Sequence, residues 1–256
     1  MNTPIIRHLP VTGSTNHDVA LLDCEARSGG QYLPEFYTIT AGFQEAGRGQ
    51  GSNHWFSDPC ENMLCSILFR PAVPASRQFL FNQYFSLTVR KFLLRYVPEV
   101  QVKWPNDIYV GGKKIAGILI EHSVAGNVIT RTIAGIGLNI NQKEFPSSLP
   151  NPTSVYLETG LRHDVEAFTA EFVAFCMAEY GRLSEGRAEE LQAEYRSCLY
   201  HLGEYRPYAV GSKRILARID GVDAYGRLLL SEKDGKEWCC GMKEIVFLSD
   251  DEAVKN

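Results

Sequence analysis

Three short segments of this chain combine glycines with charged or amide side chains. The first, residues 44–55, reads Gln-Glu-Ala-Gly-Arg-Gly-Gln-Gly-Ser-Asn-His-Trp. Successive glycines let backbone N–H groups converge on an anion, and Arg48 can add a charge-assisted hydrogen bond to a phosphate. The segment lacks the Gly-Lys-Ser/Thr ending of a P-loop and the helix-opening pattern of a dinucleotide site. A flexible surface loop is the alternative interpretation.

The second segment, Lys103-Trp104-Pro105-Asn106-Asp107, predicts a rigid turn between two lysines, Lys103 and Lys114. Taken singly, Asn106 and Asp107 are ordinary turn residues, and their oxygens can also hold a metal–phosphate group. A fixed ammonium is useful where a carboxylate attacks an α-phosphate, because both reactants are anions. The flanking lysines therefore favour phosphate chemistry over a plain turn.

The third segment, Gly135-Ile136-Gly137-Leu138-Asn139-Ile140-Asn141, reads as a strand that ends in glycine and asparagine. Glycine lets a ligand approach the backbone, and Asn139 can hydrogen-bond a ribose or a polar ring edge. A bulged strand end is the alternative.

A hairpin is predicted to position the lysine of the second segment. Residues 108–110 and 113–121 are strand-like and are joined by Gly111-Gly112, a two-residue turn that needs positive φ. Because side chains alternate across a strand, Lys113 and Lys114 point to opposite faces. At most one of these lysines can face a pocket.

The rest of the chain alternates between helical and strand-like patterns. Ser14-Thr15-Asn16 predicts a capped helix over about 15–28, ended by Gly29-Gly30. Two packed helices are expected over 165–180 and 191–198. After His201 short strands and turns predict a small β-barrel-like domain. The other expected elements are strands over 36–41, 63–69 and 127–137, and a helix whose one face carries Phe81, Phe85, Phe92 and Tyr96.

Composition limits the class of protein. The 256 residues carry a net charge of -4, and no basic patch suggests a nucleic-acid partner. No stretch approaches the roughly 18 to 20 apolar residues of a membrane span, so a cytoplasmic protein is expected. The seven cysteines sit mostly in apolar runs, without a Cys-x-x-Cys pair, and read as reduced core residues. For the adjacent Cys239 and Cys240, redox activity is the alternative to packing.

Together and in this order, with Ser14-Thr15-Asn16 before them, the three segments resemble the signature of the biotin protein ligases. The similarity covers about residues 12–160, including Thr153-Ser154-Val155-Tyr156-Leu157. Its most specific part is Lys-Trp-Pro-Asn-Asp followed by Lys-Ile-Ala-Gly-Ile-Leu-Ile-Glu at 114–121.

The resemblance implies a fold class and a division into domains. It implies an α/β (α+β) fold with a mixed sheet flanked by helices, related to the class II aminoacyl-tRNA synthetase core. A small SH3-like β-barrel domain follows it. We expect residues 1–202 to form the biotin- and ATP-binding catalytic domain and residues 203–256 to form the SH3-like domain.

The resemblance also assigns roles to residues. Lys114, Arg48 and Asp107 are the expected catalytic residues, and Asp107 is also the candidate Mg²⁺ ligand. The implied biotin-binding set is Ser14, Thr15, Asn16, Gln44, Gly47, Arg48, Gly49, Lys114 and Gly117. The implied set for ATP and the adenylate is Arg48, Gln50, Trp55, Lys103, Asn106, Asp107, Lys114 and Asn139.

The implied reaction uses ATP, Mg²⁺ and biotin as substrates, with no permanently bound metal or prosthetic group. Biotin becomes biotinyl-AMP and is then transferred to a lysine of a biotin carboxyl carrier protein. No DNA or membrane partner is expected, because nothing before Ser14 reads as a DNA-binding helix-turn-helix. Whether the chain forms a homodimer is left open.

The glycine-rich loop departs from the fuller Gly-Arg-Gly-Arg-Arg-Gly-Arg form of the family, since it has Gln50, Gly51, Ser52 and Asn53 there. With fewer cations, looser retention of the adenylate is expected. Two rival functions remain: an enzyme of lipoate attachment and a non-catalytic sensor of biotin or adenylate. The Gly-Arg-Gly and Trp-Pro-Asn-Asp runs favour biotin, and the presence of Lys114 and Arg48 favours catalysis.

Overall fold

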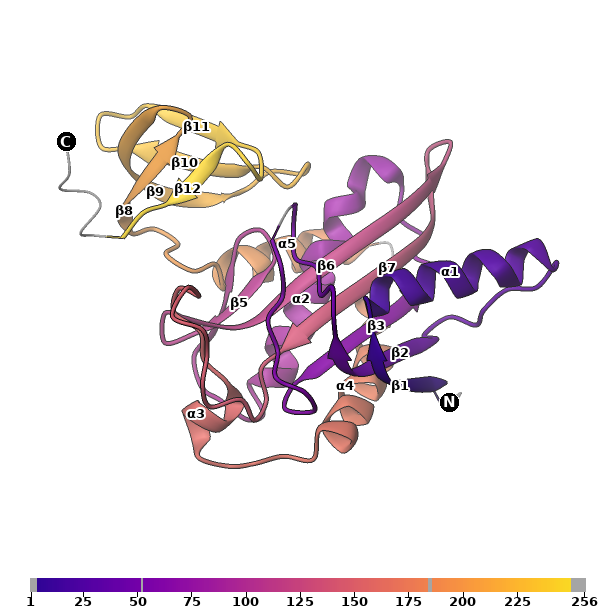
Figure 1. Ribbon diagram of the computed structural model, residues 1–256. Helices are drawn as coiled ribbons and strands as arrows, with labels where there is room; N and C mark the ends of the chain where they lie inside the picture. The colour runs from indigo at the N-terminus through magenta and orange to yellow at the C-terminus, as the bar shows by residue number, and fades with distance from the viewer. Residues whose placement is uncertain (1–3, 52, 184–185, 250–256) are drawn as a thin grey trace.

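The larger part of the protein is built on a seven-stranded mixed sheet (Figure 1). The computed structural model describes residues 4–51, 53–183 and 186–249. The strands run in the order β1-β2-β3-β7-β6-β5-β4. Only β1 and β2 pair in parallel, and each other neighbouring pair is antiparallel. The strands are β1 (Ile6–Thr12), β2 (Thr38–Gln44), β3 (Met63–Phe69), β4 (Val100–Lys103), β5 (Asp107–Val110), β6 (Lys113–Ala125) and β7 (Val128–Leu138).

Helices cover the two faces of this sheet unequally (Figure 1). On one face lies α1 (Thr15–Ser28) alone, which packs on β2, β3 and β7 through a small cluster around Val19 and Leu68. The other face carries the main core, to which Cys65, Ile67 and Phe69 of β3 contribute. Because strand residues alternate, Ser66 and Leu68 face α1. The cavity described below lies on this face, at the beginning of α1.

The main core is aromatic and centres on α2 (Gln78–Leu93). Phe92 of α2 meets Phe168 of α4 (Val165–Glu179) edge to face, with ring centroids 5.2 Å apart. Phe79 of α2 meets Tyr195 of α5 (Ala188–Ser197) at 5.9 Å. The two expected helices are thus present; α5 packs mainly on α2, whereas α4 packs on both β3 and α2. Beside them, α3 spans Val155–Thr159, and two short 3-10 turns span Ala75–Arg77 and Tyr180–Leu183.

A second, antiparallel sheet follows in the order β11-β10-β9-β8-β12. It lies apart from the larger sheet, in orange and yellow in Figure 1. Its strands are β8 (Tyr205–Val210), β9 (Lys213–Val222), β10 (Leu228–Glu232), β11 (Glu237–Cys240) and β12 (Ile245–Phe247). The predicted fold class is confirmed, and the domain boundary at 202/203 stays a prediction.

The hairpin that was expected to present a lysine has the predicted form. Gly111 and Gly112 adopt φ of +55° and +76° between β5 and β6. Lys113 is exposed and lies 3.7 Å from Glu158, whereas Lys114 is half-buried and lines a cavity. The prediction that only one of the two lysines faces a pocket is confirmed.

Other expectations need correction. The sequence pattern gave no strand over Ile6–Thr12, yet β1 forms the edge of the sheet there. Ser14 occupies the N-cap position of α1, but its side chain makes no capping hydrogen bond.

The seven cysteines are free, and Cys239 is exposed while its neighbour Cys240 is buried. Among the described residues, no helix is long and apolar enough to cross a membrane.

Candidate active site

Glycines form the floor of the site, on the α1 face of the sheet. Gly117 of β6 lies directly opposite Gly137 of β7, and Gly135 is two residues further along the same face. A Cβ placed on Gly135 would stand 2.1 Å from Asn16 Oδ1, and one on Gly137 would stand 2.3 Å from the Trp55 ring. Because such separations are far below van der Waals contact, only glycine leaves room here for the side chains above.

The loop from Gly47 to Trp55 forms the roof, and Ser52 within it lies outside the described residues. It folds back as a small hairpin, in which the Gly49 N–H donates to the Asn53 carbonyl (2.7 Å) and the Trp55 N–H to the Gly47 carbonyl (2.9 Å). The Trp55 indole rests on Gly117 and Gly137, and its buried Nε1 has no hydrogen-bond partner among the described residues. The indole thus fills the middle of the trough between the glycine floor and the loop.

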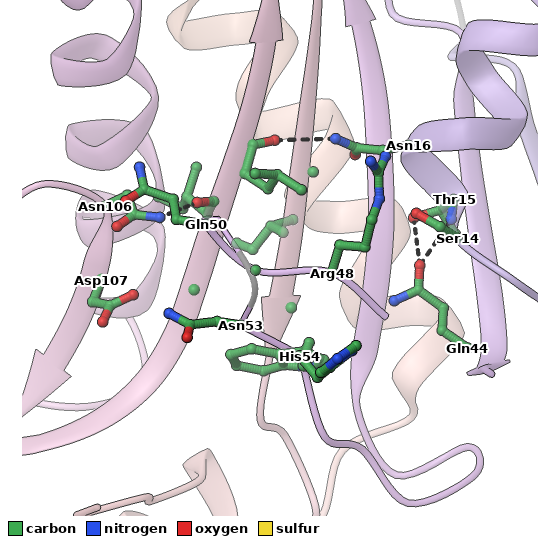
Figure 2. A pocket seen from close by; sticks show the side chains of 18 of the residues that line it. Ser14, Thr15, Asn16, Gln44, Arg48, Gln50, Asn53, His54, Asn106 and Asp107 are labelled. Carbon is green, nitrogen blue, oxygen red and sulfur yellow. Dashed lines mark hydrogen bonds between the residues drawn. The ribbon is translucent and has the colours of Figure 1, made fainter. Parts of the chain in front are cut away.

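The beginning of α1 supplies one end of the site (Figure 2). The Thr15 N–H and hydroxyl both reach Gln44 Oε1, at 2.8 and 3.1 Å. Because these contacts occupy the oxygen of the Gln44 amide, its Nε2 group is left to donate elsewhere. Ser14 is buried, lines the cavity and makes no side-chain capping hydrogen bond at the start of α1. This end is rich in neutral hydrogen-bonding groups.

Asn16 is held by a chain of buried hydrogen bonds. Its Oδ1 accepts from the Ser66 hydroxyl at 2.6 Å, and Ser66 Oγ lies 2.7 Å from Thr15 Oγ1. Its Nδ2 donates to Glu121 at 2.7 Å and to the Leu119 carbonyl at 3.3 Å. Each end of the Asn16 amide therefore has a partner of the matching kind, which fixes its orientation.

Two cations meet at the same cavity, each beside a carboxylate. Lys114 Nζ lies 2.7 Å from Asp107 Oδ1 and sits over the Trp55 ring, 5.7 Å from its centroid. Arg48 Nη2 lies 3.3 Å from Glu121 Oε1. The predicted convergence of Lys114 and Arg48 on one cavity is present.

The cavity between floor and roof has a volume of about 220 Å³. A second cavity of about 460 Å³ adjoins it and shares Trp55, Asp107 and Lys114 with it. Trp55 thus lines both cavities.

Most predicted site residues line the first cavity. Those that do are Ser14, Thr15, Asn16, Gln44, Arg48, Gly49, Gln50, Trp55, Asn106, Asp107, Lys114 and Gly117. Lys103 and Asn139 line the second cavity instead. Gly47, the first residue of the loop, is buried, and a Cβ there would stand 2.9 Å from the Trp55 carbonyl oxygen.

The second cavity has polar groups suited to a nucleotide. Asn139 Nδ2 donates to the Thr153 carbonyl at 2.8 Å, and its buried Oδ1 has no partner among the described residues. Lys103 Nζ donates to the Tyr109 hydroxyl at 3.1 Å. Burial lowers the pKa of the Lys103 ammonium from its ordinary value, an effect that nearby Asp107 opposes and nearby Lys114 strengthens.

Asp107 meets only part of the requirement for a metal site. No group of three or more histidine, cysteine, aspartate or glutamate side chains gathers as a metal centre within the described part of the chain. Magnesium is commonly held by one or two carboxylates together with substrate phosphates. One carboxylate at this place therefore fits a magnesium ion that arrives with ATP as part of the substrate.

The sequence alone assigned no role to two residues that contact the site, Ser66 and Glu121. Ser66 is a buried hydroxyl inside an otherwise apolar strand, and that mismatch was the available signal. Glu121 ends the run at residues 114–121 of β6, but nothing nearby in the sequence indicates its partners, Asn16 and Arg48, which are 105 and 73 residues away.

Comparison with known proteins places the chain in a class. The model of the biotin/lipoate A/B protein ligase family matches residues 22–139. The solved biotin protein ligase from Aquifex aeolicus in complex with biotin and ATP is 22% identical, with a TM-score of 0.75 over 96% of this chain and 99% of that one. The fold is that of the biotin and lipoate protein ligases.

Sequence relatives narrow the class further. The bifunctional ligase/repressor BirA of Escherichia coli is 30% identical over 244 residues, which cover 91% of this chain and 71% of that protein. The biotin–[acetyl-CoA-carboxylase] ligase of Mycobacterium tuberculosis is 27% identical, over 93% of this chain and 86% of that protein. The chain belongs to the biotin protein ligase family.

Proposed function

We propose that this chain activates biotin with ATP to biotinyl-AMP and then transfers the biotinyl group to a lysine of a carrier protein. The observation that carries the proposal is that Lys114 and Arg48 line one cavity, which has a glycine floor and several neutral hydrogen-bonding groups at its α1 end. A ligand with a neutral head and an anionic tail matches that distribution.

Biotin would lie along the trough with its ureido ring at the beginning of α1. The Gln44 Nε2 group and the Ser14 hydroxyl can donate to the ureido oxygen, because neither is used by a hydrogen bond within the described residues. Asn16 and Thr15 shape the same end. The carboxylate of biotin would then extend along the glycine floor toward Lys114.

In the first step, an oxygen of the biotin carboxylate attacks the α-phosphorus of ATP. The bond from that phosphorus to the bridging oxygen breaks, and pyrophosphate leaves. Two anions must approach one another, so the Lys114 ammonium and the Arg48 guanidinium would lower the barrier by neutralising charge. In the structure Lys114 is paired with Asp107, and Arg48 is paired with Glu121.

ATP would occupy the second cavity, beside Trp55, with its triphosphate directed toward Lys114. Lys103, Asn106 and Gln50 lie around that path. Asn139 Oδ1, which has no partner among the described residues, can accept from an amino group or a ribose hydroxyl. Magnesium would enter bound to the triphosphate, with Asp107 as its protein ligand.

In the second step, the amine of a carrier lysine loses a proton and attacks the carboxyl carbon of biotinyl-AMP. An amide forms, and the bond to the phosphate oxygen breaks to release AMP. Asp107 lines both cavities and can accept that proton. The partner would be the carrier protein or domain of a biotin-dependent carboxylase, and the reaction would take place in the cytoplasm, where ATP is supplied.

Streptavidin blotting of a carrier domain, after incubation with the chain, biotin and Mg-ATP, tests this function. A labelled carrier is expected, and replacing biotin with lipoate should leave it unmodified. A lipoylated carrier would instead favour lipoate attachment, which the matched family model also includes. Calorimetric binding of biotin without any turnover would favour a sensor and refute the proposed ligase activity.

Lys114→Ala tests the mechanism, and Lys113→Ala is its matched control. Loss of the Lys114 ammonium should slow pyrophosphate release by about 100- to 1,000-fold, the usual effect of removing one electrostatic donor. Lys113 is exposed and turned to the other face, so its loss should change the rate by less than about 2-fold. Normal pyrophosphate release by a folded Lys114→Ala variant would contradict the role.

A further inference from the structure

Glu121 is an acidic side chain that the proposed reaction does not require, yet it touches two residues of the site. Its Oε2 accepts from Asn16 Nδ2 at 2.7 Å, and its Oε1 lies 3.3 Å from Arg48 Nη2. A carboxylate near the path of a phosphate repels the ligand unless it is neutralised. Glu121 therefore disfavours a phosphate at this place unless a neighbouring cation neutralises it.

The position of Glu121 follows from the register of β6. Every second residue of a strand points to the same face, so residues 117, 119 and 121 share the α1 face. The Glu121 carboxylate therefore stands at the end of the glycine floor. In Figure 2, the Arg48 side chain turns toward Asn16 and away from Asp107 on the opposite side. In this structure Arg48 therefore lies at the biotin end of the cavity.

The Arg48–Glu121 pair can be broken by a ligand at small cost. The side chains keep 47% and 40% of their surface exposed, so solvent screens their attraction. Exposed pairs of this kind contribute little to stability. A phosphate in the cavity can therefore replace Glu121 as the partner of Arg48.

Asn16 needs the same carboxylate for a different reason. With Ser66 donating to its Oδ1, the Asn16 amide must donate through Nδ2, and Glu121 provides the acceptor. One oxygen of Glu121 thus orients a residue of the biotin end, and the other holds the arginine of the loop.

We propose that Glu121 is a positioning residue that orients Asn16 and holds Arg48 in the ligand-free enzyme, releasing the arginine to the adenylate phosphate. The inference rests on the proposed function and deepens it. It also implies that Glu121 competes with the ligand for Arg48 and so weakens retention of biotinyl-AMP, in a loop that already carries few cations.

Glu121→Gln separates the two tasks. The glutamine Oε1 can still accept from Asn16, whereas the negative charge that attracts Arg48 is gone. Dissociation of radiolabelled biotinyl-AMP from the enzyme is expected to slow by about 2- to 5-fold, the range that corresponds to an exposed ion pair. If Glu121 had only a structural role, biotinyl-AMP would dissociate from the Glu121→Gln variant faster than from the native chain, or at the same rate.

A double-mutant cycle with Arg48→Gln tests whether the effect passes through the arginine. In the Arg48→Gln background, Glu121→Gln should change dissociation by clearly less than it does in the native chain. Glu171→Gln is the matched control, because Glu171 pairs with Arg95 at similar exposure, 42% and 50%, far from the cavity. That variant should leave dissociation unchanged.

The outcomes distinguish this inference from the function beneath it. If the native chain forms no biotinyl-AMP, the proposed function fails first. If the native chain forms it, and Glu121→Gln speeds dissociation or acts equally with and without Arg48, the exchange model is overturned. Glu121→Ala should additionally raise the KM for biotin, because Asn16 then loses its acceptor.

Discussion

Glycine at position 135 makes room for the amide that faces it. Asn16 Oδ1 occupies space that any Cβ on residue 135 would enter, at 2.1 Å. The same amide is fixed by Ser66 and Glu121, so it has little freedom to move aside. A small side chain here should therefore act on ligand binding through Asn16.

Gly135→Ala should raise the KM for biotin in adenylate formation by about 10-fold, which corresponds to one unsatisfied hydrogen-bonding group. The KM for ATP should change little. Gly181→Ala is the control, since nothing lies within 4 Å of a Cβ there. An unchanged KM for biotin in a folded Gly135→Ala variant would contradict the role of Asn16.

Lys103 gives the nucleotide cavity a pH dependence. Burial lowers the pKa of its ammonium below the ordinary value of 10.5. As the pH rises through that lowered pKa, the positive charge is lost, so the KM for ATP should rise on the alkaline side before pH 10.5. Lys103→Arg keeps its charge, because the guanidinium stays protonated well beyond this pH range, and should move the rise to higher pH. Identical KM profiles for the two proteins would count against the assignment.

Helix α1 must be anchored if its first turn is to present Ser14, Thr15 and Asn16. Asp23 provides the anchor, fully buried, with Arg70 of the β3 end at 2.7 Å and Arg131 of β7 at 3.2 Å. A buried carboxylate between two arginines ties the helix to two strands. The geometry of the biotin end thus depends on a cluster about two turns away from it.

Asp23→Ala should cost about 3 kcal/mol of unfolding free energy, because it leaves two partly buried arginines without their counter-ion. The KM for biotin should rise, while the KM for ATP stays close to normal. Calorimetric unfolding and the two KM values provide the measurement. Glu25→Ala, an exposed position of the same helix, should be nearly neutral. Equal effects of the two substitutions would refute the anchor.

The C-terminal sheet contacts the larger part of the protein at residues 103–107. The Trp104 indole is buried, and its Nε1 donates to the Gly226 carbonyl of the β9–β10 turn at 2.9 Å. Lys103 Nζ lies over the ring of Phe247 in β12, 5.0 Å from its centroid. The C-terminal sheet therefore supports the turn that carries Asn106 and Asp107.

Trp104→Phe should leave the Gly226 carbonyl without its donor and cost about 1 to 3 kcal/mol. Because the loss loosens the turn from behind, the KM for ATP should rise more than the KM for biotin. Trp238→Phe is the matched control, since its indole donates to Glu232 within the C-terminal sheet. A KM for ATP that responds equally to both substitutions would show that the contact between the sheets does not matter.

Local patterns determined a large share of this molecule. The helix over Thr15–Ser28, the Gly111-Gly112 turn and the division between Lys113 and Lys114 were all predictable, because each depends on spacing within a few residues. The three segments that carry chemistry were recognisable for the same reason. Their glycines, amides and cations are contiguous along the chain.

The tertiary structure decided which of these groups touch. Ser66 meets Asn16 across 50 residues and Glu121 meets it across 105, and both contacts depend on the register of β3, β7 and β6 beneath α1. Three further features depend on tertiary structure: Trp55 rests on Gly137, Ser14 makes no capping hydrogen bond, and the Trp104 indole donates to the Gly226 carbonyl. A one-residue shift in register would turn each strand side chain to the other face, and no local pattern reports that choice.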